Sequence, residues 1–78
     1  MTFSDSEFYT RNNITLKDEL ISKRIIKLYI IDRKTKNLRK RKKIILKIKH
    51  YQNILRNDIK DKRYSKLMTH INKNSGIF

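Results

Sequence analysis

The feature that most constrains the fold is the absence of helix-breaking residues from nearly the whole chain. The 78 residues include no proline, and Gly76 is the only glycine. Proline ends or kinks a helix and glycine weakens one, so before Gly76 only a polar cap or a lapse in the apolar pattern can end a helix. No useful run of alternating apolar and polar residues favours a strand. We therefore expect helices joined by short polar turns.

Apolar residues at helical spacing divide the chain into a short first helix and three longer ones. Ser4 to Glu7 has the spacing of a capping box and precedes Phe8 and Tyr9, which predicts a short helix there. Thr15, with Asp18 three residues later, marks the start of a second helix. The expected apolar stripe of this second helix is Leu20, Ile21, Ile25, Leu28 and Ile31.

The second half of the chain predicts two more helices and a turn. The apolar pattern lapses over residues 35–37, and a third helix should follow over residues 38–57. The expected stripe of the third helix is Ile45, Ile48, Tyr51 and Leu55, joined by Ile44 and Ile54. Asp58 or Asp61 can cap a fourth helix. The stripe of that helix, which should pack on the third, is Tyr64, Leu67, Met68 and Ile71.

The predicted fold is therefore all-α, with three packed helices after a short N-terminal helix. Residues 1–15 should form the short helix and a loop, and residues 16–73 the helical core. Residues 74–78 should form a frayed tail, as chain ends often do.

The charge of the chain is strongly positive and unevenly distributed. Lys and Arg number 21 against 7 Asp and Glu, giving a net charge of +14. Residues 21–56 contain fourteen of the bases and a single acid, Asp32. Only 37% of the chain is hydrophobic, and without cysteine it has no disulfide and no thiolate-ligated zinc. Cations packed together repel one another, whereas cations on phosphates release condensed counterions, so we expect an anionic partner.

The strongest local signal is the run 33–43, which contains eight bases in eleven residues. Arg grips phosphate through two parallel hydrogen bonds and Lys supplies a mobile point charge. Because the run spans a turn and a helix start, it can follow a bent backbone, and we expect contacts mainly to phosphates rather than to base edges. The candidate RNA-binding residues are Arg24, Lys27, Arg33, Lys34, Lys36, Arg39, Lys40, Arg41, Lys42, Lys43, Lys47, Lys49 and Tyr64.

The sequence has no set of residues typical of an enzyme. His50 and His70 lack a carboxylate at the spacing of a metal or catalytic pair, and the acids lie near expected helix starts, where capping explains them. Tyr29, Tyr51 and Tyr64 fall on apolar stripes, so core packing is the first interpretation and base stacking the second. We expect no catalytic residue, metal, cofactor or small-molecule substrate.

Four segments of the chain resemble a known family. Residues 20–28 read Leu-Ile-Ser-Lys-Arg-Ile-Ile-Lys-Leu, and residues 42–48 read Lys-Lys-Ile-Ile-Leu-Lys-Ile. In character and spacing they resemble the segments Leu-Leu-Thr-Glu-Arg-Ile-x-Arg-Leu and Arg-Arg-Gly-Leu-Leu-Lys-Leu of protein fifteen of the small ribosomal subunit, bacterial and organellar type. With short deletions, the Leu-Leu of that family falls on residues 54–55 and its Arg-Tyr-x-x-Leu-Ile on residues 63–68. The resemblance covers residues 16–71.

The sequence departs from this family at the family's signature residues. Residues 12–15 replace a Thr-Gly-Ser loop, and Ile44 replaces a glycine. The family's His, His, Asp and Ser, which contact the rRNA minor groove, fall on Ile31, Thr35, Leu38 and Arg41, so that contact is not carried over. The resemblance implies a four-helix protein at a helical junction in the central domain of small-subunit rRNA, beside other ribosomal proteins. The matching RNA-binding positions are Arg24, Lys42, Lys43 and Tyr64.

Composition and the first residues bear on where the protein works. Ile, Lys and Asn, which have AT-rich codons, are abundant, while Ala, Val and Pro are absent. Asp5 and Glu7 stand where a transit peptide would be basic. We therefore expect a protein made within an organelle and placed in its ribosome, in a mitochondrion in preference to a plastid, or otherwise in the cytoplasm of an AT-rich organism.

Two other functions would also use the positive charge. A small DNA-binding protein of a nucleoid or a phage could use the same cations. A cationic membrane-active peptide would need a sustained apolar face opposite its lysines. The longest apolar stretch, residues 25–31, contains Lys27 and is much shorter than a membrane span, so we expect no membrane partner.

Overall fold

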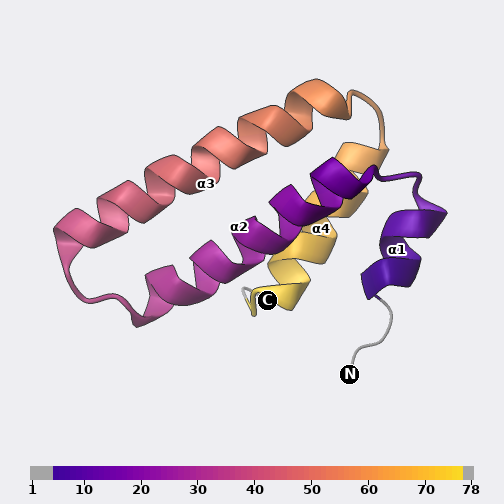
Figure 1. The fold of residues 1–78 in the computed structure, drawn as a ribbon. Coiled ribbons are helices and arrows are strands. Elements are labelled where there is room, and N and C mark those ends of the chain that lie inside the picture. Colours follow the sequence, from indigo (N-terminus) through magenta and orange to yellow (C-terminus); the bar gives the residue numbers. More distant parts are fainter. Residues whose placement is uncertain (1–4, 77–78) are drawn as a thin grey trace.

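The computed structural model describes residues 5–76, and this part of the chain contains helices and no strand. The four helices are α1 (Asp5–Arg11), α2 (Leu16–Lys34), α3 (Leu38–Asp58) and α4 (Arg63–Asn74). Figure 1 shows α2 and α3 side by side as an antiparallel hairpin, with α4 crossing behind α2 and α1 beside it. The predicted all-α fold, with three packed helices after a short first one, is confirmed.

Polar side chains begin both helices of the hairpin. The Thr15 hydroxyl accepts a hydrogen bond from the Asp18 N–H at 3.2 Å, which confirms the predicted start of α2. The Asn37 side chain accepts from the Arg39 N–H at 2.9 Å and so caps α3. The predicted turn at residues 35–37 is also confirmed. The capping box predicted for α1 begins at Ser4, which lies outside the described residues.

Both ends of α4 are closed by local contacts. The carboxylate of Asp61, one of the two predicted caps, accepts a hydrogen bond from the Arg63 N–H at 2.9 Å. At the other end Ser75 is buried, and its hydroxyl donates to the carbonyl of Ile71 at 2.6 Å. Gly76 then takes the left-handed conformation that commonly ends a helix, at φ 75°. The predicted fraying is therefore wrong for residues 74–76; residues 77–78 lie outside the described part.

The core is thin and draws residues from every element. Its buried apolar side chains are Tyr9, Ile14, Ile25, Ile48, Leu55, Ile59, Leu67 and Ile71. The predicted stripes of α3 and α4 each supply two of these residues. Tyr9 and Ile14 come from α1 and the turn after it, so the N-terminal segment helps to cover the core.

Three residues predicted to face the core are exposed instead. Leu20 is 58%, Ile31 46% and Ile45 40% exposed. α2 is apolar around much of its circumference, and packing selects the face that carries Ser22 and Ile25, both fully buried. The Ser22 hydroxyl donates to the carbonyl of Asp18 at 2.8 Å, so this polar group is paired inside the core. In α3 the neighbouring Ile44, rather than Ile45, continues the stripe.

The position of α4 also differs from the prediction. α4 lies mainly against α2, not against α3, and Figure 1 shows it crossing behind α2. The physical reason is that α2 offers apolar residues on two sides, one toward α3 and one toward α4, whereas α3 has one stripe and α2 already covers it. Leu67 and Ile71 of α4 are nevertheless fully buried in the shared core.

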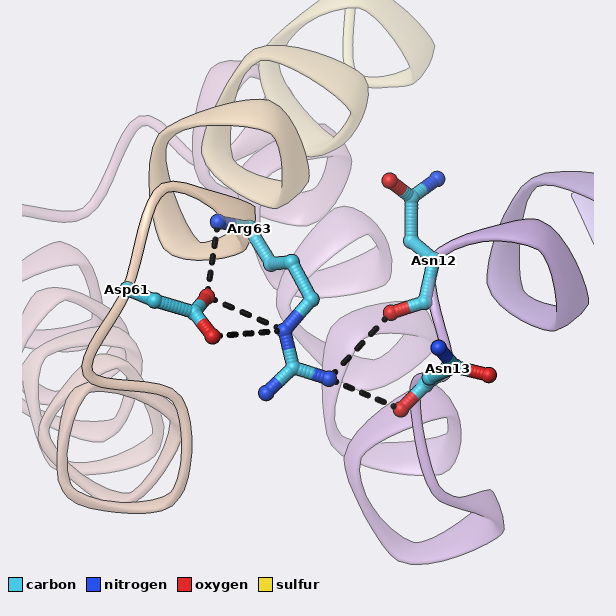
Figure 2. A network of polar contacts seen from close by, with 4 residues as sticks. All are labelled: Asn12, Asn13, Asp61 and Arg63. Atoms are coloured by element: carbon cyan, nitrogen blue, oxygen red, sulfur yellow. Dashed lines mark hydrogen bonds and ion pairs between the residues drawn. The ribbon is translucent and has the colours of Figure 1, made fainter.

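The guanidinium of Arg63 ties the turn after α1 to the start of α4 (Figure 2). Its Nε donates to both carboxylate oxygens of Asp61 at 3.0 Å. Its Nη1 donates to the carbonyls of Asn12 and Asn13 at 3.3 and 3.2 Å. Asn13 has a left-handed φ of 54°, a conformation that asparagine tolerates better than most residues. This cation therefore holds the fold together rather than facing a ligand.

The buried carboxyl group of Asp18, at the start of α2, interacts with the exposed carboxyl group of Asp58, at the end of α3. Asp18 is 3% exposed, and this burial is the main cause that raises the pKa of its carboxyl group. The neighbouring Asp58 raises the pKa of Asp18 further, through a side-chain hydrogen bond and through charge repulsion. The hydrogen bond from Asp18 lowers the pKa of Asp58, whose Oδ2 also lies 3.5 Å from the Lys17 ammonium. Asp58 is therefore the last residue of α3, where it interacts with Asp18, and it does not cap α4. Because the pKa of Asp18 is raised and that of Asp58 is lowered, a proton bound by the pair favours Asp18 over Asp58.

We expect Asp18→Asn to raise the melting temperature at pH 7 and to flatten the dependence of stability on pH. Because the pKa of Asp18 is raised in the folded state, its contribution is full below the unfolded value of about 4 and is lost as pH rises through the folded pKa. Asparagine is neutral throughout and can still donate to Asp58, so it avoids that loss. Thermal melts from pH 3 to 8 measure this.

Asp61→Asn is the control with the opposite sign. The Arg63 side chain lowers the pKa of Asp61, so this carboxylate stabilises the fold above its unfolded pKa and less as pH falls through the folded value. The control variant should therefore lower the melting temperature at pH 7 and change it less at pH 3. An Asp18→Asn protein that melts at or below the wild-type temperature at pH 7 would contradict the proton-sharing interpretation.

Candidate nucleic-acid interface

The run 33–43, here called the basic tip, occupies one end of the hairpin. It comprises the last two residues of α2, the turn 35–37 and the first turns of α3. Figure 1 places it at the end of the molecule away from α1 and from the turn between α3 and α4. The longest dimension of the molecule is 38 Å. The basic tip is therefore well separated from the residues that tie α1 to α4.

Local hydrogen bonds set the path of the chain through the tip. The Thr35 hydroxyl donates to the Ile31 carbonyl at 2.7 Å, and the Thr35 N–H donates to the Asp32 carbonyl at 3.1 Å, so α2 ends there. The Asn37 side chain begins α3 two residues later. A turn of three residues thus brings the end of one helix beside the start of the next, and both ends carry cations.

The two helix ends differ in how they tolerate those cations. Arg33 and Lys34 lie in the last turn of α2, where positive charge complements the helix dipole. Arg39 and Lys40 lie in the first turn of α3, which contains no acid, so they oppose the dipole. The start of α3 is therefore unfavourable for the free protein, and an anion placed there would relieve it.

Two of the eight cations of the tip are engaged within the protein. The Nε of Arg41 lies 3.3 Å from a carboxylate oxygen of Asp32 and joins α3 to α2. The Nη1 of Arg33 donates to the carbonyl of Gly76 at 3.4 Å. A Cβ at position 76 would lie 3.0 Å from that Nη1, so a glycine there gives Arg33 room. Arg33 and Arg41 are therefore exposed cations that also help to position the tip.

The other cations of the tip are free to contact a partner. All are exposed, and their side chains make no hydrogen bond or ion pair with any part of the chain that the structure describes. These six residues are Lys34, Lys36, Arg39, Lys40, Lys42 and Lys43.

The remaining predicted residues lie elsewhere. Arg24, Lys27 and Lys47 line a groove of about 620 Å³ between α2 and α3. Lys49 is exposed on α3 and does not line this groove. Tyr64 is half-buried against the core in the first turn of α4, which begins at the end of the molecule opposite the basic tip (Figure 1). The structure thus brings together the run 33–43 but not the whole predicted set.

Sequence reasoning missed the cations that surround Tyr64. Arg56 and Lys60 line a hollow of about 570 Å³ with Tyr64, where they are joined by the amide side chains of Asn53 and Asn57. The hollow also contains the carboxylate of Asp61. No charge run marks these residues in the sequence, because they come from two helices and the turn between them. Only the fold brings them together.

Both histidines lie beside aromatic rings. The ring of His70 stacks on that of Phe8, with centroids 4.1 Å apart and planes 5° apart. His50 is exposed, with its ring centroid 5.5 Å from that of Tyr51. Among residues 5–76, no three His, Cys, Asp or Glu side chains are grouped so that they could hold a metal ion. Within the same residues, no helix has the length and apolar character needed to cross a membrane.

Comparisons of the chain with family models, curated proteins and solved structures found no match. What the site can do therefore follows from the charge and shape of its own residues. Six exposed cations distributed over two helix ends and a turn form a surface that suits a polyanion with a bent backbone.

Proposed function

We propose that the protein is a structural constituent of the small ribosomal subunit and binds rRNA phosphates at a helical junction. The observation that carries the proposal is the set of six exposed cations of the basic tip, which have no partner among the described residues. Each cation that meets a phosphate releases a condensed counterion, and this term dominates affinity for nucleic acid. The resemblance of residues 16–71 to protein fifteen of the small subunit supports rRNA as the nucleic acid.

The geometry of the tip favours a junction over a straight duplex. Proteins that read duplex DNA commonly lay one helix along the major groove. Here the free cations lie on both sides of the turn 35–37, and the following stretch of α3 turns its stripe through Ile48 and Leu55 into the core. Such a surface contacts phosphates that converge from two directions, as they do where RNA helices meet.

Phosphate contact also removes the conflict at the start of α3. Arg39 and Lys40 oppose the helix dipole, and the first turn contains no compensating acid. A phosphate beside these residues pairs with the cations, while the Asn37 side chain continues to accept from the N–H groups of Arg39 and Lys40. Composition supports an organellar ribosome, mitochondrial in preference to plastid, as the place where this happens.

Comparing two nucleic acids tests this function. We expect the full chain to bind a three-way-junction RNA about tenfold more tightly than duplex DNA with the same number of phosphates, because only the junction offers converging phosphates. Fluorescence anisotropy at matched salt measures both affinities. We also expect the chain to stay with small ribosomal subunits through a high-salt wash and sedimentation. Equal affinity for both nucleic acids together with release in the wash would favour the DNA-binding alternative.

A further inference from the structure

α2 carries apolar side chains on a face that no other described element covers. Leu16 is 70%, Leu20 58% and Ile31 46% exposed, although the opposite face of the same helix lies in the core. Exposed apolar side chains gathered on one face mark an interaction surface. This face of α2 is therefore a candidate interaction surface.

The groove between α2 and α3 combines this apolar face with positive charge. Its lining includes Leu20, Arg24, Lys27, Ile31, Lys47 and Tyr51, and no carboxylate. Arg24, Lys27 and Lys47 are exposed and make no ion pair with a described side chain. A fourth lining cation, Lys23, is already paired with Glu19 at 3.0 Å. The groove thus presents an apolar floor and three free positive charges.

We propose that this groove, here called the α2–α3 groove, binds an acidic amphipathic helix of another protein. The occupant must supply apolar side chains to Leu20 and Ile31 and carboxylates to the cations between them. These two residues are eleven positions apart on α2, about 16 Å at 1.5 Å per residue, which matches about three turns of a second helix. Helices that lie in apolar grooves are recognised through such spaced anchors, and complementary charge fixes their register.

Other occupants fit the α2–α3 groove less well. Nucleic acid phosphates would pair with the cations but would leave Leu20 and Ile31 uncovered. A membrane surface needs a sustained apolar face, whereas Lys27 and Arg24 interrupt this face between Leu20 and Ile31. The proposal assigns Arg24, Lys27 and Lys47, which were candidate RNA-binding residues, to a protein partner. The proposed rRNA binding is carried by the basic tip, so either proposal can fail without the other.

A designed peptide tests the proposal with the full chain. The peptide has about 14 residues, with leucines at helical i, i+3, i+4, i+7 spacing and glutamates beside them. A counterpart has lysine in place of every glutamate. By fluorescence anisotropy we expect the glutamate peptide to bind and the lysine peptide not to bind. Leu20→Ser combined with Ile31→Ser should weaken binding about tenfold or more, because two apolar contacts are lost.

Matched variants separate the groove from apolar exposure in general. Leu38 and Leu46 are 72% and 66% exposed on α3 and do not line the α2–α3 groove, so Leu38→Ser with Leu46→Ser should leave peptide affinity unchanged. Lys27→Glu with Lys47→Glu should abolish binding of the glutamate peptide and permit binding of the lysine peptide. Circular dichroism of each variant should match that of the wild type, since all the substituted side chains are exposed.

Each opposite result overturns the proposal. Failure of the glutamate peptide to bind would do so, as would equal binding of both peptides or indifference to the Leu20 and Ile31 substitutions. If those substitutions instead weaken binding to phosphatidylglycerol vesicles or to junction RNA, the groove binds lipid or nucleic acid. Junction RNA affinity that survives them while peptide binding is lost supports both proposals as separate properties.

Discussion

Replacing Arg39, Lys40, Lys42 and Lys43 together with glutamine should weaken RNA binding about a thousandfold at about 0.1 M salt. Each lost phosphate contact lowers the slope of log affinity against log salt by about 0.7–0.9, and four lost contacts give this factor. All four side chains are exposed and make no contact with the described residues, so the fold should persist. Arg41 stays in place because it pairs with Asp32.

The same variant should be at least as stable as the wild type when free. Arg39 and Lys40 oppose the dipole of α3, so removing their charges stabilises the helix start by a few tenths of a kcal/mol to about 1 kcal/mol each. A salt titration of RNA affinity and a thermal melt of the free protein measure the two effects. RNA affinity should fall while the stability of the free protein stays the same or rises. A variant that binds weakly because it is misfolded would lose both.

A charge-matched control distinguishes the effect of the cations at the basic tip from the effect of the net charge of the protein on RNA binding. Replacing Lys60, Lys62, Lys66 and Lys73 with glutamine removes the same charge from exposed positions at and after the turn between α3 and α4. This control should keep most of the salt slope. If both quadruple variants flatten the slope equally, binding is not localised to the tip. An unchanged slope in the tip variant would place the RNA on another face of the molecule.

Truncating one core side chain should have the largest effect on the fold. Leu67 is fully buried in the cluster that contains Ile25, Leu55 and Ile71. Leu67→Ala should cost about 2–5 kcal/mol of unfolding free energy, as truncations of buried leucines do. Because domains are stable by only about 5–15 kcal/mol and this core is thin, much of that margin should be lost.

Urea unfolding followed by circular dichroism measures the cost of Leu67→Ala. Leu38→Ala is the control, because Leu38 is 72% exposed and its truncation should change stability by less than about 0.5 kcal/mol. If the two variants unfold at the same urea concentration, α4 is not held by its apolar stripe. Addition of RNA should partly restore the Leu67→Ala protein, since a ligand that binds only the native state stabilises it.

Helix positions were predictable because few residues compete with helix in this chain. Without proline or internal glycine, polar residues were the remaining signals for helix starts. Thr15 caps α2 as predicted. For α4 the predicted caps were Asp58 or Asp61; the N-cap position is Lys62, and Asp61 beside it accepts from the Arg63 N–H. The buried face of α3 was largely predictable as well, since its stripe is narrow. The buried face of α2 was not, because its apolar residues surround the helix. There the burial of Ser22, which no apolar pattern indicates, decides which side faces the core.

The candidate site was also only partly predictable from the sequence. The charge run located the basic tip, but it could not tell Arg33 and Arg41 from their neighbours. Arg41 pairs with Asp32, nine positions earlier, and Arg33 contacts Gly76, which lies 43 positions later. Whether a cation makes a contact within the protein depends on which residues the fold places beside it. Two neighbouring cations with the same charge can therefore differ in their contacts. Arg63, which looks like one more base, is a structural residue for the same reason.

The distribution of long-range contacts implies that the two ends of the molecule open independently. Arg63 joins residues 51 positions apart at the end where α1 meets α4. Within the tip, Thr35 bonds to Ile31 and Arg41 to Asp32, and Arg33 adds an exposed contact to Gly76. A short opening of the tip therefore exposes little apolar surface, and amides there should exchange with solvent well before those around Leu55. If the proposed function holds, such local opening lets the tip adjust its backbone to rRNA while the core remains folded.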